Sequence, residues 1–118
     1  MVLYMPFDTQ SNNNATYGTY GVKDYSGKMN NGNLSGGTIW NASGYKGGAY
    51  SFDGSNDYII VKDSNNLDIN LTWTLSAWVK PKGFGTNDII LHKYGAVWVN
   101  RAGYGFRQIG SGELKVDV

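Results

Sequence analysis

The sequence contains no cysteine, only two prolines and a single glutamate, and these shortages exclude several classes of protein. Without cysteine the chain forms no disulfide and no thiolate metal site. A net charge of +1 argues against a strongly basic nucleic-acid surface and against a polybasic membrane patch. The sequence also lacks an apolar run of about 18 residues, the length that a membrane-spanning helix needs. We therefore expect neither nucleic-acid binding nor membrane insertion.

Residues that carry catalytic chemistry are equally scarce. Glu113 is the only glutamate, and His92 is the only histidine and lies in an apolar run, where a packed histidine is the usual interpretation. The sequence contains neither the closely spaced carboxylate pair of a glycosidase nor a serine in a nucleophile elbow. We therefore expect a protein that is not an enzyme, and we assign no catalytic residue.

Glycine and aromatic residues are abundant instead. Glycine accounts for 17 of the 118 residues, and aromatic residues make up 14% of the chain. This glycine content is about twice the average usage, and it shows no triplet period, which excludes collagen. Many glycines together with many aromatic residues favour short strands joined by tight turns. The composition therefore predicts an all-β fold.

Strand signals recur along the whole chain. The clearest is a β-hairpin predicted from strand formers at residues 49–52, turn residues at 53–57 and a β-rich run at 58–61. The strongest single strand is expected at residues 72–81, where Trp73, Leu75, Ala77 and Val79 alternate onto one face and Trp78 is expected to have a structural role. Further strands are expected at residues 2–8, 38–40, 88–93, 96–99, 103–109 and 113–118.

Residues 47–58 (Gly-Gly-Ala-Tyr-Ser-Phe-Asp-Gly-Ser-Asn-Asp-Tyr) resemble the central motif of the laminin-G-like, concanavalin-A-like jelly rolls. Residues 74–81 (Thr-Leu-Ser-Ala-Trp-Val-Lys-Pro) and the block that opens with Asp-Tyr-Ser-Gly at residues 24–27 resemble the same family. The resemblance implies a β-sandwich jelly roll that forms a single domain over residues 1–118, with Thr9–Gly37 as a long loop region. It also implies a one-turn helix within residues 63–68.

In that family further strands follow the point at which this sequence stops, so the resemblance implies the N-terminal part of a domain. An incomplete sandwich leaves open sheet edges, which proteins in solution normally avoid. We therefore expect the sheet to be completed by a further chain segment or by copies of this chain in a homo-oligomer.

A calcium site is predicted at the turn that holds Asp53 and Asp57. The turn supplies several oxygen ligands within five residues, and domains of this family often carry calcium. The alternative is that the two aspartates cap their own turn. No cofactor other than calcium is expected.

A glycan-binding surface is suggested by aromatic residues with an amide nearby, because sugar faces stack on aromatic rings and amides bind hydroxyl groups. The candidates are Trp40, Tyr45, Tyr94, Trp98 and Asn100. The alternative is that these aromatic residues pack in the core, and that Trp40 covers a sheet edge.

Four asparagines lie in Asn-x-Ser/Thr acceptor sequences for glycosylation, namely Asn14, Asn33, Asn41 and Asn70. Glycosylation at these positions would place the protein outside the cell, at the cell surface or on a virion surface. The alternative is that an asparagine-rich composition produces the motifs by chance.

Two functions of different classes follow. The first is a non-catalytic extracellular recognition module that binds a glycan or a protein, within a larger adhesin-like protein. The second is a structural subunit of a surface layer, filament or virion, in which neighbouring chains complete the sandwich. A weaker third alternative is an appendage of a glycan-processing enzyme. The fold by itself does not choose among them.

Overall fold

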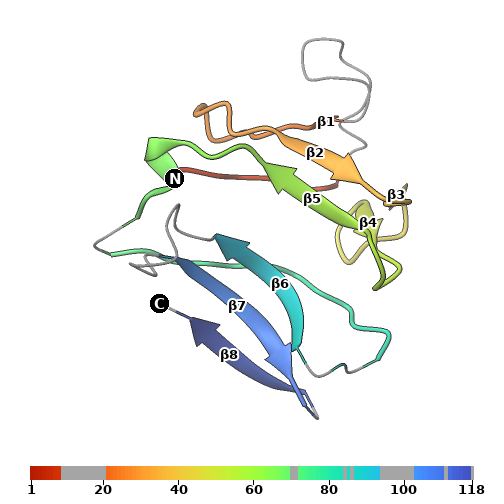
Figure 1. Cartoon of the computed structure of the whole chain (residues 1–118). Helices are drawn as coiled ribbons and strands as arrows, with labels where there is room; N and C mark the ends of the chain where they lie inside the picture. Colours follow the sequence, from red (N-terminus) through yellow and green to blue (C-terminus); the bar gives the residue numbers. More distant parts are fainter. Residues whose placement is uncertain are drawn as a thin grey trace. The chain divides into compact units, whose positions relative to one another are not determined.

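The computed structural model of the chain is all-β, with three antiparallel sheets (Figure 1), which confirms the predicted fold class at this level. It describes residues 1–8, 21–69, 72–83, 85, 87–93, 103–110 and 112–117. Contacts divide the chain into two compact units, Met1–Ile69 and Asn70–Val118, which we describe separately. Among the described residues, no helix is long and apolar enough to cross a membrane. The jelly-roll topology and the single domain stay predictions.

The first unit contains two small antiparallel sheets. One has the strand order β1-β2-β5 and consists of Gly21–Val22 (β1), Gly32–Ser35 (β2) and Tyr58–Val61 (β5). The other pairs Ile39–Asn41 (β3) with Ala49–Ser51 (β4). All five strands are short, so little of this unit is held by ladder hydrogen bonds alone.

The predicted β-hairpin over residues 49–61 is wrong in its pairing. Strands form on both sides of the turn, but β4 pairs with β3, whereas β5 pairs with β2. The turn therefore connects two sheets instead of closing one ladder. Local sequence showed the strands and the turn, but the partner of each strand depends on residues distant in the sequence.

The predicted long loop over Thr9–Gly37 contains strands β1 and β2 within its described part. Strand β1 is only two residues long and begins with glycine, and β2 begins with glycine and asparagine, residues that are depleted in strands, so neither strand was predicted. Gly32 is required on β2, because a Cβ atom there would lie 2.5 Å from Cγ2 of Ile59 on β5. Close packing between the two strands therefore explains a residue that looked like part of a loop.

Residues 2–8 were expected to form a strand, but no strand is assigned to them. They run as an extended segment held by single hydrogen bonds, from the Tyr25 amide to the Tyr4 carbonyl (2.8 Å) and from the Gly48 amide to the Asp8 carbonyl (3.1 Å). Pro6 has no N–H to donate to a ladder, and Phe7 has a positive φ of 60°, so a regular strand cannot continue here. The one-turn helix is confirmed as the 3₁₀-helix η2, Asn65–Leu67, in which Leu67 is buried.

The second unit contains one three-stranded antiparallel sheet in the order β6-β7-β8. Its strands are Asn87–Lys93 (β6), Tyr104–Ile109 (β7) and Glu113–Asp117 (β8). The register of β6 against β7 shifts between Ile89 and Leu91, which marks a β-bulge. Three of the predicted strands are thus confirmed, while the strand expected at residues 96–99 lies outside the described residues.

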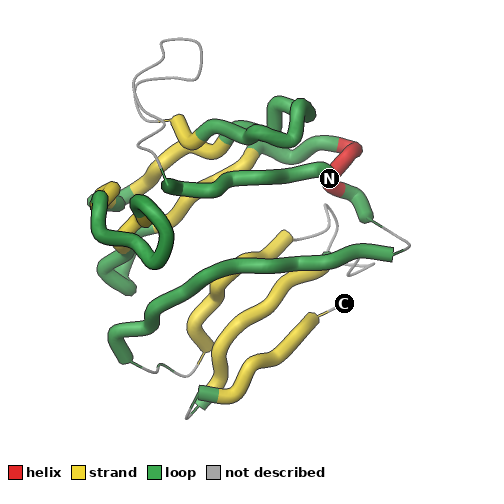
Figure 2. The backbone as a smooth tube through the Cα atoms, turned by 180° about the vertical axis from the view of Figure 1, so that it is seen from behind, coloured by secondary structure: helices red, strands yellow, loops and turns green. Residues whose placement is uncertain are grey.

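The strand predicted at residues 72–81 is wrong, because this segment is an extended loop (Figure 2). The predicted alternation nevertheless holds at its start, where Trp73 and Leu75 are half-buried and their neighbours are exposed. The Trp73 ring lies 5.8 Å from the ring of Tyr104 on β7. The alternation of apolar and polar residues correctly predicted which side of the segment faces the sheet. It did not indicate whether a neighbouring backbone pairs with the segment. Trp78 is 80% exposed, and the structural role expected for it stays a prediction.

Candidate functional site

The turn at Asp53–Asp57 is closed by its own carboxylates. Asp57 accepts hydrogen bonds from the amides of Asp53 (2.9 Å) and Gly37 (2.5 Å). Asp53 accepts from the amides of Ser55 (2.8 Å) and Asn56 (3.4 Å). The Gly37 contact comes from the end of β2 and fastens the turn to the first sheet.

Both aspartates thus cap backbone groups, which is the alternative considered for them from sequence. Within the described residues, no group of three or more histidine, aspartate or glutamate side chains is arranged to hold a metal ion. Calcium binding at Asp53 and Asp57 stays a prediction.

Trp40 is part of the packing of the first unit. Its indole N–H donates to the Phe7 carbonyl (2.9 Å), and its ring lies so close to Gly48 that any Cβ atom there would collide with it. Phe7 in turn makes an edge-to-face contact with Tyr50, with ring centroids 5.1 Å apart. Trp40 therefore anchors the N-terminal segment to the β3–β4 sheet.

The other predicted glycan-binding residues are only partly placed. Tyr45, between β3 and β4, is 79% exposed. Tyr94, Trp98 and Asn100 lie outside the described residues. The described residues therefore do not show whether the five candidates form one stacking surface, and their role in glycan binding stays a prediction.

The predicted glycosylation sites divide in the same way. Asn33 on β2 and Asn41 at the end of β3 are both exposed. The Asn41 side chain accepts a hydrogen bond from the Ser43 amide (2.8 Å). Asn14 and Asn70 lie outside the described residues. Exposure makes Asn33 and Asn41 accessible to modification, which stays a prediction.

A buried carboxylate that the sequence analysis did not single out organises the first unit. Asp24 is 5% exposed and accepts hydrogen bonds from the amides of Tyr4 (3.0 Å), Ser26 (2.8 Å) and Asn30 (2.9 Å) and from the Ser26 hydroxyl (2.7 Å). Burial alone would raise the pKa of Asp24, but these hydrogen bonds outweigh it and lower the pKa below its ordinary value. The Asp-x-Ser spacing, typical of a side chain that bonds a backbone amide two residues on, was the available signal.

Asn30 extends this polar cluster to two other parts of the unit. Its amide group donates to the Val2 carbonyl (2.7 Å) and to Oδ1 of Asn66 in η2 (2.6 Å). Both oxygens of Asp24 and the amide of Asn30 are thus occupied by protein groups. We interpret the cluster as structural, since its acceptors are already satisfied.

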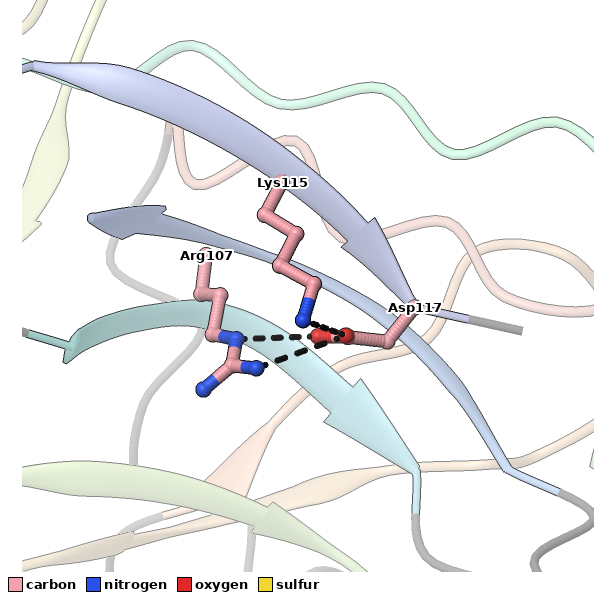
Figure 3. A network of polar contacts seen from close by, with 3 residues as sticks. All are labelled: Arg107, Lys115 and Asp117. Carbon is pink, nitrogen blue, oxygen red and sulfur yellow. Dashed lines mark hydrogen bonds and ion pairs between the residues drawn. The ribbon is translucent and has the colours of Figure 1, made fainter.

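The sheet of the second unit carries a charged face. Asp117 on β8 pairs with Nε of Arg107 on β7 (3.0 Å) and with Nζ of Lys115 (3.4 Å), and the three side chains point toward one another (Figure 3). Partial burial would raise the pKa of Asp117, but the charge and hydrogen bond of Arg107, followed by Lys115, lower it below its ordinary value. Asp117 also separates two cations that the register sets directly opposite each other, Arg107 and Lys115.

The opposite face of the same sheet borders an open pocket of about 450 Å³. The pocket lies between the extended loop and strands β7 and β8, and it is lined by Trp73, Thr74, Leu75, Ser76, Ala77, Phe106, Leu114 and Val116. Two of the β8 side chains remain largely exposed, Leu114 at 69% and Val116 at 60%. The alternation along residues 73–77 and 113–117 was the sequence signal for this surface, although it was interpreted only as evidence for strands.

A buried amide lies on this apolar face. Gln108 on β7 is 6% exposed and stands directly opposite Leu114 of β8. Its Nε2 has no hydrogen-bond partner within the part of the chain that the structure describes. A buried donor without a partner raises the free energy of the folded state. A polar acceptor that bound at this end of the apolar face would therefore stabilise the protein.

Comparisons of the chain with models of protein families, with curated proteins and with solved structures gave no match. What the structure defines is an all-β protein with a capped turn, a polar cluster and a sheet that has one charged and one apolar face. The laminin-G-like resemblance stays a prediction from sequence motifs.

Proposed function

We propose that the chain is a non-catalytic recognition module of the laminin-G-like β-sandwich type, exposed at the cell surface or outside the cell. We propose further that it binds a glycan in the pocket of its second unit. The observation that carries this proposal is the pocket itself, whose volume of about 450 Å³ falls within the size range of ligand sites.

The lining suits a sugar because it combines two kinds of group. Trp73 and Phe106 supply aromatic surface for the apolar C–H face of a sugar ring. Thr74 and Ser76 also line the pocket and are exposed, and we propose that their hydroxyl groups bond to sugar hydroxyls at its open rim. No charged side chain lines the pocket among the described residues, so a neutral glycan fits better than an acidic one.

The first experiment is a glycan array probed with the 118-residue chain, once with calcium and once with a chelator. The affinity of any glycan that binds is then measured by calorimetry for the wild type and for the double variant Thr74→Val, Ser76→Ala. Each lost hydrogen bond costs about 0.5–1.5 kcal/mol, so we expect affinity to fall about tenfold. These substitutions remove hydroxyl groups while leaving the Trp73–Tyr104 contact in place.

Tyr45→Ala is the matched control, because Tyr45 is an exposed aromatic residue of the first unit and a glycan-binding candidate from sequence. If Tyr45→Ala abolished binding and the double variant did not, the pocket would be the wrong site. Binding lost only with the chelator would instead favour a calcium site as the ligand contact.

The second candidate function, a structural subunit completed by neighbouring chains, is favoured by a different observation. Leu114 and Val116 are exposed on β8, the outermost strand of its sheet. Exposed apolar residues on an edge strand favour pairing with another strand. Light scattering on the purified chain separates the two candidates, because a recognition module forms a monomer or at most a closed dimer, whereas a structural subunit assembles into larger species.

A further inference from the structure

Strand β8 offers an open edge. It pairs on one side with β7, and no strand pairs with its other side in the part of the chain that the structure describes. An unpaired edge presents a row of backbone donors and acceptors to any strand of matching pattern. Proteins often protect such an edge with charges, and β8 has charges of both signs, so they do not simply repel.

The side chains of β8 alternate strictly between two faces. Glu113, Lys115 and Asp117 lie on the charged face, in the order negative, positive, negative. Leu114 and Val116 lie on the apolar face, beside Phe106 of β7 in the case of Val116. A partner strand must therefore match both a charge pattern and an apolar pattern.

A second β8 meets both requirements when it lies antiparallel in one of two registers. With Leu114 of both copies on the two-fold axis, Glu113 of each copy faces Lys115 of the other. With Val116 on the axis, Lys115 of each copy faces Asp117 of the other. With Lys115 on the axis, Glu113 of each copy would face Asp117 of the other, and the two negative charges would repel. If one strand were shifted by a single residue, the charged face of one copy would continue into the apolar face of the other.

We propose that the outer edge of β8 binds β8 of a second copy of this chain, antiparallel, with Leu114 or Val116 at the two-fold axis. The pairing extends the sheet symmetrically to β6-β7-β8 followed by the same three strands in reverse order. It covers part of the exposed surface of Leu114 and Val116, and it brings the opposite charges of the two copies together. Such a self-complementary contact is the usual form of a symmetric dimer.

This proposal does not depend on glycan binding. The double variant Thr74→Val, Ser76→Ala changes the extended loop and leaves every residue of β8 in place. If a variant loses glycan binding but still dimerises, the result concerns the pocket alone. If a variant no longer dimerises but still binds the glycan, the result concerns β8 alone.

Disulfide trapping tests the contact directly, because the chain has no cysteine of its own. Residues that face each other across an antiparallel pair have Cα atoms about 4.5–5.5 Å apart, within the range that a disulfide spans. Under mild oxidation we expect Leu114→Cys or Val116→Cys to give a covalent dimer, and the variant that reacts identifies the register. Ile60→Cys is the matched control, since Ile60 is 54% exposed on β5 of the first unit.

A charge exchange tests the recognition. Lys115→Glu makes β8 acidic at all three charged positions, and the double variant Glu113→Lys, Asp117→Lys makes it basic at all three. In sedimentation experiments the wild type should dimerise with rising concentration, each variant alone should stay monomeric, and an equimolar mixture should dimerise again. Circular dichroism confirms that each variant is folded.

The outcomes decide the proposal even if a charge variant fails to fold, because the cysteine variants keep all three charges. A wild type that stays monomeric over the whole concentration series, together with no faster cross-linking of the β8 cysteines than of Ile60→Cys, would overturn it. Charge variants that are folded and still dimerise would also overturn it, since another surface would then make the contact.

Discussion

The two units of this chain are stabilised in different ways. In the first unit the strands are two to four residues long, and much of the order comes from side chains that bond to backbone groups. In the second unit the strands are five to seven residues long and form one three-stranded sheet, with a β-bulge between β6 and β7. The comparison shows that a polar, glycine-rich sequence can be ordered by a few well-placed acceptors where it lacks long strands.

The difference extends to what each unit leaves exposed. The first unit buries a charged group, Asp24, and occupies both of its oxygens. The second unit leaves apolar side chains of an edge strand in contact with solvent and buries the Gln108 amide, whose Nε2 has no hydrogen-bond partner among the described residues. The polar cluster of the first unit is thus satisfied by protein groups, whereas the second unit borders a pocket and carries exposed apolar side chains on an edge strand, which is why both proposals concern it.

The largest effect is expected from Asp24→Ala, which tests whether the polar cluster stabilises the first unit. The substitution leaves the amides of Tyr4, Ser26 and Asn30 without their acceptor, and an unsatisfied buried donor costs about 1–3 kcal/mol. Because the three losses are coupled, we expect the free energy of unfolding of the first unit to fall by about 3–5 kcal/mol. Amide hydrogen exchange measured by mass spectrometry should show lost protection in residues 21–35.

The matched control is Asp53→Ala, which removes an exposed carboxylate that also caps backbone amides. We expect it to cost about 1 kcal/mol, since water satisfies the freed amides. The β6–β8 amides should keep their protection in both variants, because none of these hydrogen bonds belongs to that ladder. If Asp24→Ala also removed the protection of the β6–β8 amides, the two units would unfold together.

Acid should weaken the first unit through the same residue. The pKa of Asp24 is lowered in the folded state, so its ionisation contributes stability above the ordinary aspartate pKa. That contribution is lost as the pH falls through the lowered pKa. We expect urea midpoints of the wild type to fall in this range, and those of Asp24→Asn to depend less on pH. Equal slopes for the two proteins would show that Asp24 does not carry the effect; Asp117, whose pKa is also lowered, contributes equally to both.

Gly48→Ala tests how much the contact between the N-terminal segment and the β3–β4 sheet contributes to the stability of the first unit. The added methyl group would collide with the ring of Trp40, whose N–H holds the Phe7 carbonyl. Overpacking of this kind costs about 1–3 kcal/mol. Thermal unfolding followed by tryptophan fluorescence measures the loss. Gly83→Ala is the control, because a methyl group there meets no atom within 4 Å, and it should leave the midpoint nearly unchanged.

The smallest effect is expected from Arg107→Gln in the second unit. The ion pair with Asp117 has side chains that are 30% and 35% exposed, and pairs of this kind contribute little to stability because water and salt screen the two charges. We expect a small fall in the urea midpoint that shrinks further at high salt. A fall as large as that of Asp24→Ala would mean that the ladder of the second unit also depends on a polar cluster.

Local sequence patterns predicted a good part of this molecule. The helix η2 was implied by the family resemblance, whereas the all-β class, the turn at Asp53–Asp57 and strands β6, β7 and β8 were expected from these patterns. Each of these depends on neighbouring residues, such as turn formers or a strict alternation of side chains. Trp40 was also anticipated in one of its two interpretations, as a packed residue at a sheet edge.

The failures share a physical cause. Residues 72–81 have the composition and alternation of a strand, yet strand formation requires a partner backbone in register, which composition does not report. Strands β1 and β2 were missed for the opposite reason, since they pair despite poor local propensity. The pocket was missed because the residues that line it, 73–77, 106, 114 and 116, are brought together only by the tertiary structure.

The amino-acid composition and pattern set the kinds of interaction available to this protein: no disulfides, little charge, many turns and many short apolar alternations. They also set the charge order of β8, on which the proposed self-pairing depends. Long-range packing selects which strands pair, which carboxylate is buried and which alternating segment leaves its apolar side exposed. Those outcomes depend on contacts between residues far apart in the chain, whose free energies no local window of sequence contains.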